Sequence, residues 1–277
     1  MHIGWVAIMN KVFGYILGFL SSIIIVLVSM FFILKITVFN KNYLIKSLET
    51  SSYYDKVYDE IGKDMKNSLR SSGLDDSVVN NLYKKSDVKS DIANLVGSIY
   101  SGSKYYPSTT EIENKLRNNI DKYLKSKNIV LEDKTILDSY ISSVIEVYSK
   151  ETSLYGYLQN YTSRFVKISN AIDFIIALGV ILLVIIIIIN KYKFKIHFLG
   201  VTFLSSSMMI LYLKQFIWNK IDYENILIIS KAFSDVLRII LADINKYTIY
   251  LAVIFALLGF GLIFINSWKN KRNRKLN

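Results

Sequence analysis

Four long stretches without a charged residue dominate the hydrophobic pattern of this chain. They are Val12–Leu34, Phe174–Ile189, Ile196–Leu213 and Tyr247–Trp268. A helix needs ~20 residues to cross the ~30 Å hydrocarbon core of a bilayer. Together with their flanks, these stretches predict transmembrane helices at residues 12–36, 168–190, 196–214 and 247–268.

Residues 37–167 have a different pattern, which is typical of a folded helical domain. Apolar side chains recur every three or four residues, as at Tyr54, Val57, Ile61 and Met65, and this spacing places them on one helical face. No run alternates with the period of two that indicates a strand. We therefore predict an all-α polytopic membrane protein with four transmembrane helices and a helical domain between the first two.

Capping signals indicate where some helices of this domain begin and end. Ser52 with Asp55, and Thr110 with Glu113, have the spacing of a capping box, in which two side chains satisfy free backbone N–H groups at a helix start. Gly102 is expected to end the helix that precedes it.

Residues 215–246 predict an amphipathic helix rather than a fifth span. Lys231, Asp235 and Arg238 interrupt its apolar pattern, and each would cost roughly 2.5 to 3.5 kcal/mol at the centre of a membrane helix. Two placements fit this pattern. The helix lies either on the membrane surface or against the helical domain.

The distribution of basic residues predicts the orientation. The 277 residues carry a net charge of +12, and nine Lys or Arg residues, without any Asp or Glu, fall in residues 1–11, 191–195 and 269–277. Short loops rich in Lys and Arg stay in the cytoplasm. We therefore expect a multi-pass protein of the cell membrane with both termini and the loop 191–195 inside, and with residues 37–167 and 215–246 outside. Because the excess charge flanks the spans, we expect the lipid bilayer and not nucleic acid as the partner of these residues.

Small residues recur along two of the predicted spans. Gly14, Gly18 and Ser22 follow one another every four residues in the first, and Ala252 and Ala256 have the same spacing in the fourth. Such stripes allow two membrane helices to approach closely. We expect these five positions to pack against another span or a membrane partner.

A few polar residues lie inside or at the ends of the spans. Asp173 is a candidate intramembrane polar residue that either pairs with Lys35 or Lys214 or rests in the headgroup region. Ser205, Ser206 and Ser207 either line a polar path or form hydrogen bonds within and between helices.

Tyrosine is concentrated in the predicted outer domain, which holds fourteen of the twenty in the chain. Tyrosines of this kind either fill a helical core or form a flat surface for a glycan or a protein. Tyr105 and Tyr106, which precede the single proline, Pro107, are our candidates for binding a partner.

Few residues are available for chemistry. The chain has no Cys and only two His, His2 and His197, both in segments expected on the cytoplasmic side. This leaves neither a thiolate nor a histidine-rich ligand set, so we expect no metal centre and no cofactor. The sequence also lacks a phosphate-binding glycine loop and a nucleophile elbow, and these absences argue against an enzyme.

Two resemblances extend the interpretation. Asn40, Tyr43 and Leu44, followed by the spacing Ser52-x-Tyr54-x-x-Val57-Tyr58-x-x-Ile61, resemble uncharacterised four-pass membrane proteins of low-GC Gram-positive bacteria. The order of spans and outer segments is similar to that of FtsX and MacB subunits, which implies an associated ATPase. In that family the ATPase grips a cytoplasmic helix between the second and third spans, whereas the corresponding connection here has about six residues.

These observations favour a non-enzymatic membrane protein whose outer helical domain senses, scaffolds or binds a membrane or cell-envelope protein. The first alternative is an FtsX-like or MacB-like subunit of a transporter or mechanotransmission complex. The second is a membrane-embedded enzyme.

Overall fold

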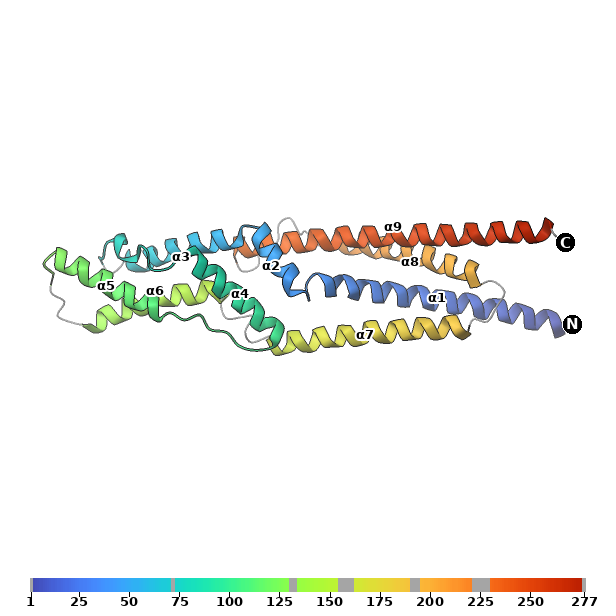
Figure 1. The fold of residues 1–277 in the computed structure, drawn as a ribbon, viewed down its shortest axis with the longest axis horizontal. Helices are drawn as coiled ribbons and strands as arrows, with labels where there is room; N and C mark the ends of the chain where they lie inside the picture. Colours follow the sequence, from blue (N-terminus) through green and yellow to red (C-terminus); the bar gives the residue numbers. More distant parts are fainter. Residues whose placement is uncertain are drawn as a thin grey trace. The chain divides into compact units, whose positions relative to one another are not determined.

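The computed structural model describes residues 2–70, 73–129, 134–153, 162–189, 195–220 and 230–275 (Figure 1). Every regular element within these ranges is helical, which confirms the all-α prediction for the described residues. The predicted cytoplasmic loop 191–195, except for Lys195, lies outside the described residues. So do residues 221–229 of the predicted amphipathic segment.

The chain forms two compact units. The spanning unit contains residues 1–40, 169–226 and 237–277, and the helical unit contains residues 41–168 and 227–236. Each unit is built from segments that are distant in sequence, so both require tertiary contacts to form.

The spanning unit confirms the prediction of four apolar helices. They are α1 (His2–Ile36), α7 (Thr162–Ile189), α8 (Lys195–Trp218) and α9 (Lys231–Lys275). Each contains a stretch that is long and apolar enough to cross a membrane. Helices α1 and α8 pack along each other.

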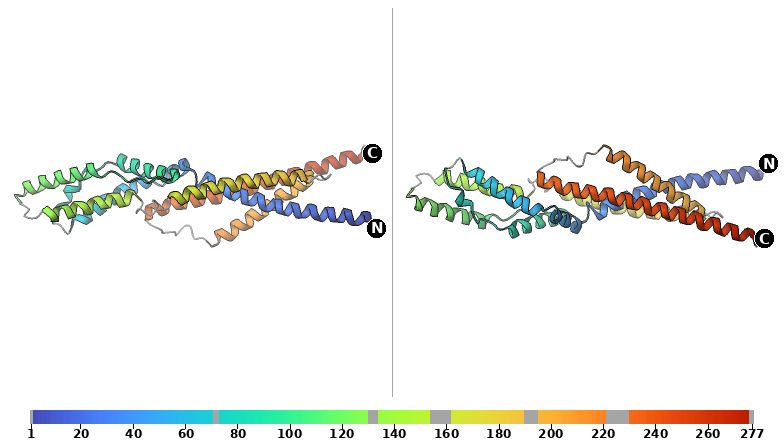
Figure 2. Two further views of the ribbon diagram at one scale, coloured as in Figure 1. Left: turned by 90° about the horizontal axis from the view of Figure 1, so that it is seen from below. Right: turned by 90° about the horizontal axis from the view of Figure 1, so that it is seen from above.

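Helix α9 joins two segments that the sequence analysis separates at residue 246. It is one continuous helix of 45 residues, and the right-hand view of Figure 2 shows it unbroken. Ser230 Oγ accepts a hydrogen bond from the Phe233 N–H at 3.2 Å and so caps its start. Neither Gly nor Pro occurs between Lys231 and Leu258, so no residue in this stretch breaks the helix. The first turns of α9 belong to the helical unit and the rest to the spanning unit.

The helical unit is arranged around α3 (Tyr53–Leu69), which packs against α4 (Lys85–Ser101) and α6 (Lys134–Thr152). The remaining elements are α2 (Lys41–Thr50), the short 3₁₀ helix η2 (Asp76–Val79) and α5 (Thr110–Ser126). The apolar stripe predicted on α3 is buried: Val57, Ile61, Met65 and Leu69 are all in the core. The core continues with residues of α4, α5 and α6, namely Val88, Ile92, Leu95, Leu116, Ile120, Ile141 and Val144.

The structure corrects both predicted capping boxes. Ser52 has a φ of 55°, in the left-handed region, and its side chain makes no capping bond. A capping serine needs an extended backbone, and here the tight turn between α2 and α3 prevents it. Helix α5 begins one residue earlier than the motif requires, with Thr109 at its N-cap position, and Glu113 instead bonds Arg117.

The predicted stop at Gly102 is confirmed. Its φ of 73° is left-handed, and the following residue, Ser103, donates its N–H to Ser98 O at 3.0 Å. Glycine adopts this conformation without a steric penalty, so it closes α4 efficiently.

Candidate functional site

The small-residue stripe of α1 faces α8 over two of its three positions. A Cβ added to Gly18 would lie 3.0 Å from the ring of Phe198. One turn later, Ser22 Oγ donates to Thr202 O of α8 at 3.1 Å. Gly14, in contrast, has no atom of the described residues within 4 Å of an added Cβ. The packing contact with α8 therefore involves Gly18 and Ser22, and Gly14 is open.

The candidate residues of α9 face the same group of helices. Ala252 is completely buried with Val26 of α1 and Ile210 of α8, whereas Ala256 is only half-buried. The apolar cluster around Ala252 thus joins three of the four long helices.

The hydroxyls of α8 form bonds between helices. Ser206 Oγ lies 3.3 Å from Ser22 O of α1, and Ser207 Oγ donates to Ala252 O of α9 at 2.7 Å. These bonds favour the second of the two roles proposed for the serines. Hydrogen bonding in place of water stabilises polar groups within a membrane helix bundle.

Two close approaches in the spanning unit involve Gly200 and Gly179, neither of which the sequence pattern singled out. An added Cβ at Gly200 of α8 would lie 3.0 Å from Gly259 O of α9, and one at Gly179 of α7 would clash with Val28 of α1. Each is a lone glycine in an apolar run, without the four-residue repeat that marks a stripe. The presence of glycine in such a run was the only available signal.

Asp173 forms an ion pair with one of the two lysines considered for it. Lys35 Nζ lies 2.7 Å from Asp173 Oδ2 and 2.9 Å from Ser169 Oγ. The pair ties the C-terminal end of α1 to the N-terminal part of α7. Because the Asp173 carboxylate remains half exposed, we expect the pair to orient the helices more than to stabilise them.

In the helical unit, tyrosines gather around one carboxylate. Asp91 on α4 accepts a hydrogen bond from Tyr105 at 2.7 Å through Oδ1 and from Tyr148 on α6 at 2.6 Å through Oδ2. Burial, and then the bond to Asp91, raises the pKa of both phenols. Tyr148 also packs against Tyr83, with ring centroids 5.4 Å apart. The cluster holds the segment after α4 against the core.

The two candidate partner-binding tyrosines therefore differ in their surroundings. The hydroxyl of Tyr105 is engaged by Asp91, and its side chain is half-buried. Tyr106 is 70% exposed. Tyr106 thus has an exposed ring, and Tyr105 holds the backbone beside it.

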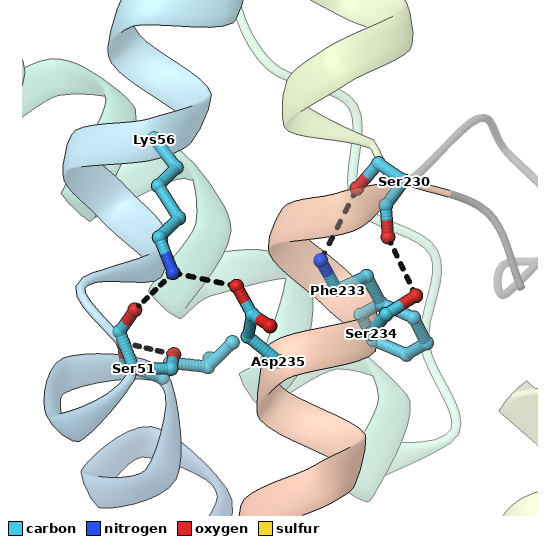
Figure 3. A network of polar contacts seen from close by, with 7 residues as sticks. Ser51, Lys56, Ser230, Phe233, Ser234 and Asp235 are labelled. Atoms are coloured by element: carbon cyan, nitrogen blue, oxygen red, sulfur yellow. Dashed lines mark hydrogen bonds and ion pairs between the residues drawn. The ribbon is translucent and has the colours of Figure 1, made fainter. Parts of the chain in front are cut away.

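A second polar contact fixes the start of α9 within the helical unit (Figure 3). Lys56 Nζ of α3 bonds Asp235 Oδ2 of α9 at 2.8 Å and also donates to Ser51 O at 2.9 Å. Beside Asp235, the side chains of Ala232, Ser234 and Val236 are buried. Of the predicted amphipathic segment 215–246, residues 230–236 belong to the helical unit, whereas residues 215–220 and 237–246 belong to the spanning unit.

The described residues contain no group of three or more His, Cys, Asp or Glu side chains placed to hold a metal ion.

Burial, and then the nearby charge of Glu49, raises the pKa of Tyr54 to about 12, so this phenol is neutral at physiological pH.

Comparisons with known proteins add no relative: no protein-family model, no curated protein and no solved structure matches this chain.

Proposed function

We propose that this chain is a non-enzymatic membrane protein whose helical unit lies outside the cell membrane and binds a membrane or cell-envelope protein. Binding at the helical unit would bias the membrane helices through α9. The role is one of sensing or scaffolding, and it requires a protein partner to pass the signal on.

The continuity of α9 is the observation that carries this proposal. Its first turns are anchored in the helical unit by the buried Ala232 and Val236 and by the pair of Asp235 with Lys56. The same helix then contributes Ala252 and Gly259 to contacts in the spanning unit. An element shared by two packed units is the physical requirement for coupling between them.

The surface around Tyr106 supports a binding role. Aromatic side chains are enriched where proteins bind each other, because one rigid ring covers a large area at a small cost in entropy. Tyr105 is held by Asp91, so the backbone that carries Tyr106 is fixed in advance. Preorganisation of this kind lowers the entropic cost of binding.

The orientation can be tested directly, because the chain has no cysteine. We propose single substitutions Lys104→Cys in the helical unit and Lys271→Cys near the end of α9. A membrane-impermeant maleimide added to intact cells should label the first and should label the second only after permeabilisation. Labelling of Lys271→Cys in intact cells would reverse the proposed topology.

Partner binding is tested by crosslinking in cells, purification of the full chain in mild detergent and mass spectrometry of the proteins recovered. A membrane or cell-envelope protein should be enriched with the unmodified chain and strongly reduced with Tyr106→Ala. Ile136→Ala, also an exposed position of the helical unit, serves as the matched control and should leave recovery unchanged.

The other outcomes separate the alternatives. Recovery of an ATPase would favour a transporter or mechanotransmission subunit and would contradict our objection based on the short connection after α7. Repeated recovery of no partner, together with no phenotype when the helical unit is deleted, would rule out the binding role. Lipid or peptidoglycan turnover that is lost on a single polar substitution would instead indicate an enzyme.

A further inference from the structure

A cavity of about 450 Å³ lies in the spanning unit between α1 and α8. Ile23, Val26 and Leu27 of α1 line one side, and Met208, Tyr212 and Leu213 are among the α8 residues that line the other. Apart from the Tyr212 hydroxyl, the lining is hydrocarbon and thioether. Its natural occupant within a bilayer is therefore a hydrocarbon chain.

The face of α8 that borders this cavity ends in a lysine. Phe216 follows Tyr212 and Leu213 by four and three residues, so the three side chains share one helical face. Lys220 Nζ lies 4.2 Å from the centroid of the Phe216 ring, a cation–π distance. The ammonium group is thus held on the cavity side of the helix end.

Lys220 remains available for an anion. It is exposed, and within the described ranges no Asp or Glu side chain pairs with it. Lys35, which ends α1, differs because Asp173 neutralises its charge. A phosphate at Lys220 would give this cation a partner that the described residues do not supply.

The spacing between the lysine and the cavity matches one leaflet of a bilayer. Met208 and Lys220 are twelve positions apart, which is ~18 Å along a helix at ~1.5 Å per residue. Half of the hydrocarbon core is ~15 Å. A lipid with its phosphate at Lys220 would pass its chain along Phe216 and Tyr212 and reach the cavity near the bilayer centre.

Tyr212 adds a polar requirement along this path. Its side chain is 72% exposed, and it lies six residues before the end of α8 at Trp218, or ~9 Å along the helix. The ring of Tyr212 therefore lies alongside the acyl chain, and its hydroxyl forms hydrogen bonds by reaching towards the ester groups of the lipid.

We propose that the spanning unit binds an anionic glycerophospholipid, with one acyl chain in the α1–α8 cavity and the phosphate at Lys220.

The first test is native mass spectrometry of the delipidated full chain, titrated with phosphatidylglycerol or with phosphatidylcholine of the same chain length. Phosphatidylglycerol should bind more tightly, and Lys220→Gln should weaken its binding about fivefold, with a smaller loss for phosphatidylcholine, whose choline group offsets the charge of its phosphate. Lys246→Gln is the matched control, because Lys246 also lies over a ring, that of Tyr250, 5.7 Å away on α9. Equal effects of the two substitutions would overturn the assignment of the phosphate to Lys220.

The second test fills the cavity. Leu27→Trp should reduce phosphatidylglycerol binding, whereas Leu257→Trp, on an exposed position of α9, should not. Circular dichroism of each variant first establishes that the helices are retained. A folded Leu27→Trp protein that binds as the parent chain does would exclude the cavity as the site of the acyl chain.

A phosphatidylglycerol with a photoreactive group in its tail provides an independent readout. Labelling should concentrate on peptides that contain Leu27 and Met208 and should decrease in Lys220→Gln. Even labelling of the exposed faces of α7 and α9 would mean ordinary contact with bulk lipid and would overturn the proposal. A crosslink between two chains at these peptides would assign the cavity to a second copy instead.

Discussion

In the helical unit, large apolar side chains such as Ile61, Met65 and Leu116 are completely buried, whereas in the spanning unit Phe174, Leu182 and Leu257 are exposed on the outside of their helices. Besides a few apolar side chains such as Val26 and Ile210, the spanning unit buries small and hydroxyl-bearing residues, among them Ser22, Thr202, Ser206 and Ala252. The first arrangement relies on removing apolar surface from water. In a bilayer that driving force between helices is absent, so close approach and hydrogen bonds hold the second arrangement.

The largest expected effect is the loss of a core side chain of the helical unit. Ile61→Ala removes a fully buried side chain and should lower the free energy of unfolding by about 2–5 kcal/mol. Hydrogen exchange of the α3 amides in the full chain measures this loss. Ile136→Ala, at a position 54% exposed, should cost far less; similar losses for the two would remove the contrast between core and surface.

The corresponding change in the spanning unit adds atoms rather than removing them. In Gly259→Ala the new Cβ would lie 2.6 Å from Leu204 Cγ and 2.8 Å from Gly200 O, an overpacking that should cost about 1–3 kcal/mol. Gly261→Ala is the control, since nothing lies within 4 Å of its added Cβ. The free energy of unfolding of both variants is measured in mixed micelles. Equal values would contradict the close approach of α8 and α9.

The buried tyrosines should make the helical unit sensitive to alkaline pH. Burial raises the pKa of Tyr54 from 10.0 to about 12, so the folded state holds this proton more tightly than the unfolded state. This contribution to stability is complete below pH 10 and is lost as the pH rises towards 12. The melting temperature should therefore fall between pH 10 and pH 12, and less steeply in Tyr54→Phe. If the melting temperatures of the two proteins fall in parallel with pH, the pKa of Tyr54 is the same in the folded and unfolded states.

A hydroxyl that donates a hydrogen bond to another helix should contribute more to the free energy of unfolding than one that bonds within its own helix. Ser207→Ala removes the bond to Ala252 O of α9 and should cost about 0.6 kcal/mol, with ~1.7 kcal/mol as an upper value. In Ser21→Ala the lost bond is to Leu17 O of the same helix, so the effect should be smaller. Unfolding in micelles measures the loss of stability in each variant. A larger loss in Ser21→Ala than in Ser207→Ala would argue against the hydrogen bond between α8 and α9.

The smallest effect is expected for the ion pair of Lys35 and Asp173. A double-mutant cycle with Lys35→Gln and Asp173→Asn should give a coupling free energy of about 0.2–1 kcal/mol that decreases with added salt. A coupling of several kcal/mol that is independent of salt would indicate a buried pair, and with it the functional intramembrane role considered for Asp173.

The difference between the two units also explains which features were predictable. Runs without charge and apolar positions at helical spacing depend only on local sequence, because they reflect the solvent that each segment meets. The four apolar helices and the buried stripe of α3 were therefore predicted and are confirmed. The capping boxes were predicted from local spacing as well, but the turn at Ser52 is set by the packing of α2 and α3, so the motif was overridden.

Contacts between distant segments needed the tertiary structure. The sequence marked Asp173 and two lysines but could not choose between them, because the choice depends on how α1 lies against α7. It proposed the Gly14 stripe as one surface, of which only Gly18 and Ser22 meet α8. The glycine pair Gly200 and Gly259 and the carboxylate shared by Tyr105 and Tyr148 follow from helix crossings that no local pattern encodes.

The sequence by itself determined that the chain is helical, that four helices are apolar enough to span a bilayer, and where the excess positive charge lies, because each is a property of residues close together in the chain. The tertiary structure decided which helices touch, which polar groups pair and that α9 contributes to both units. These contacts depend on the shapes of the segments and the distances between them, and they join residues as far apart in the sequence as Lys56 and Asp235. They form only when the segments pack.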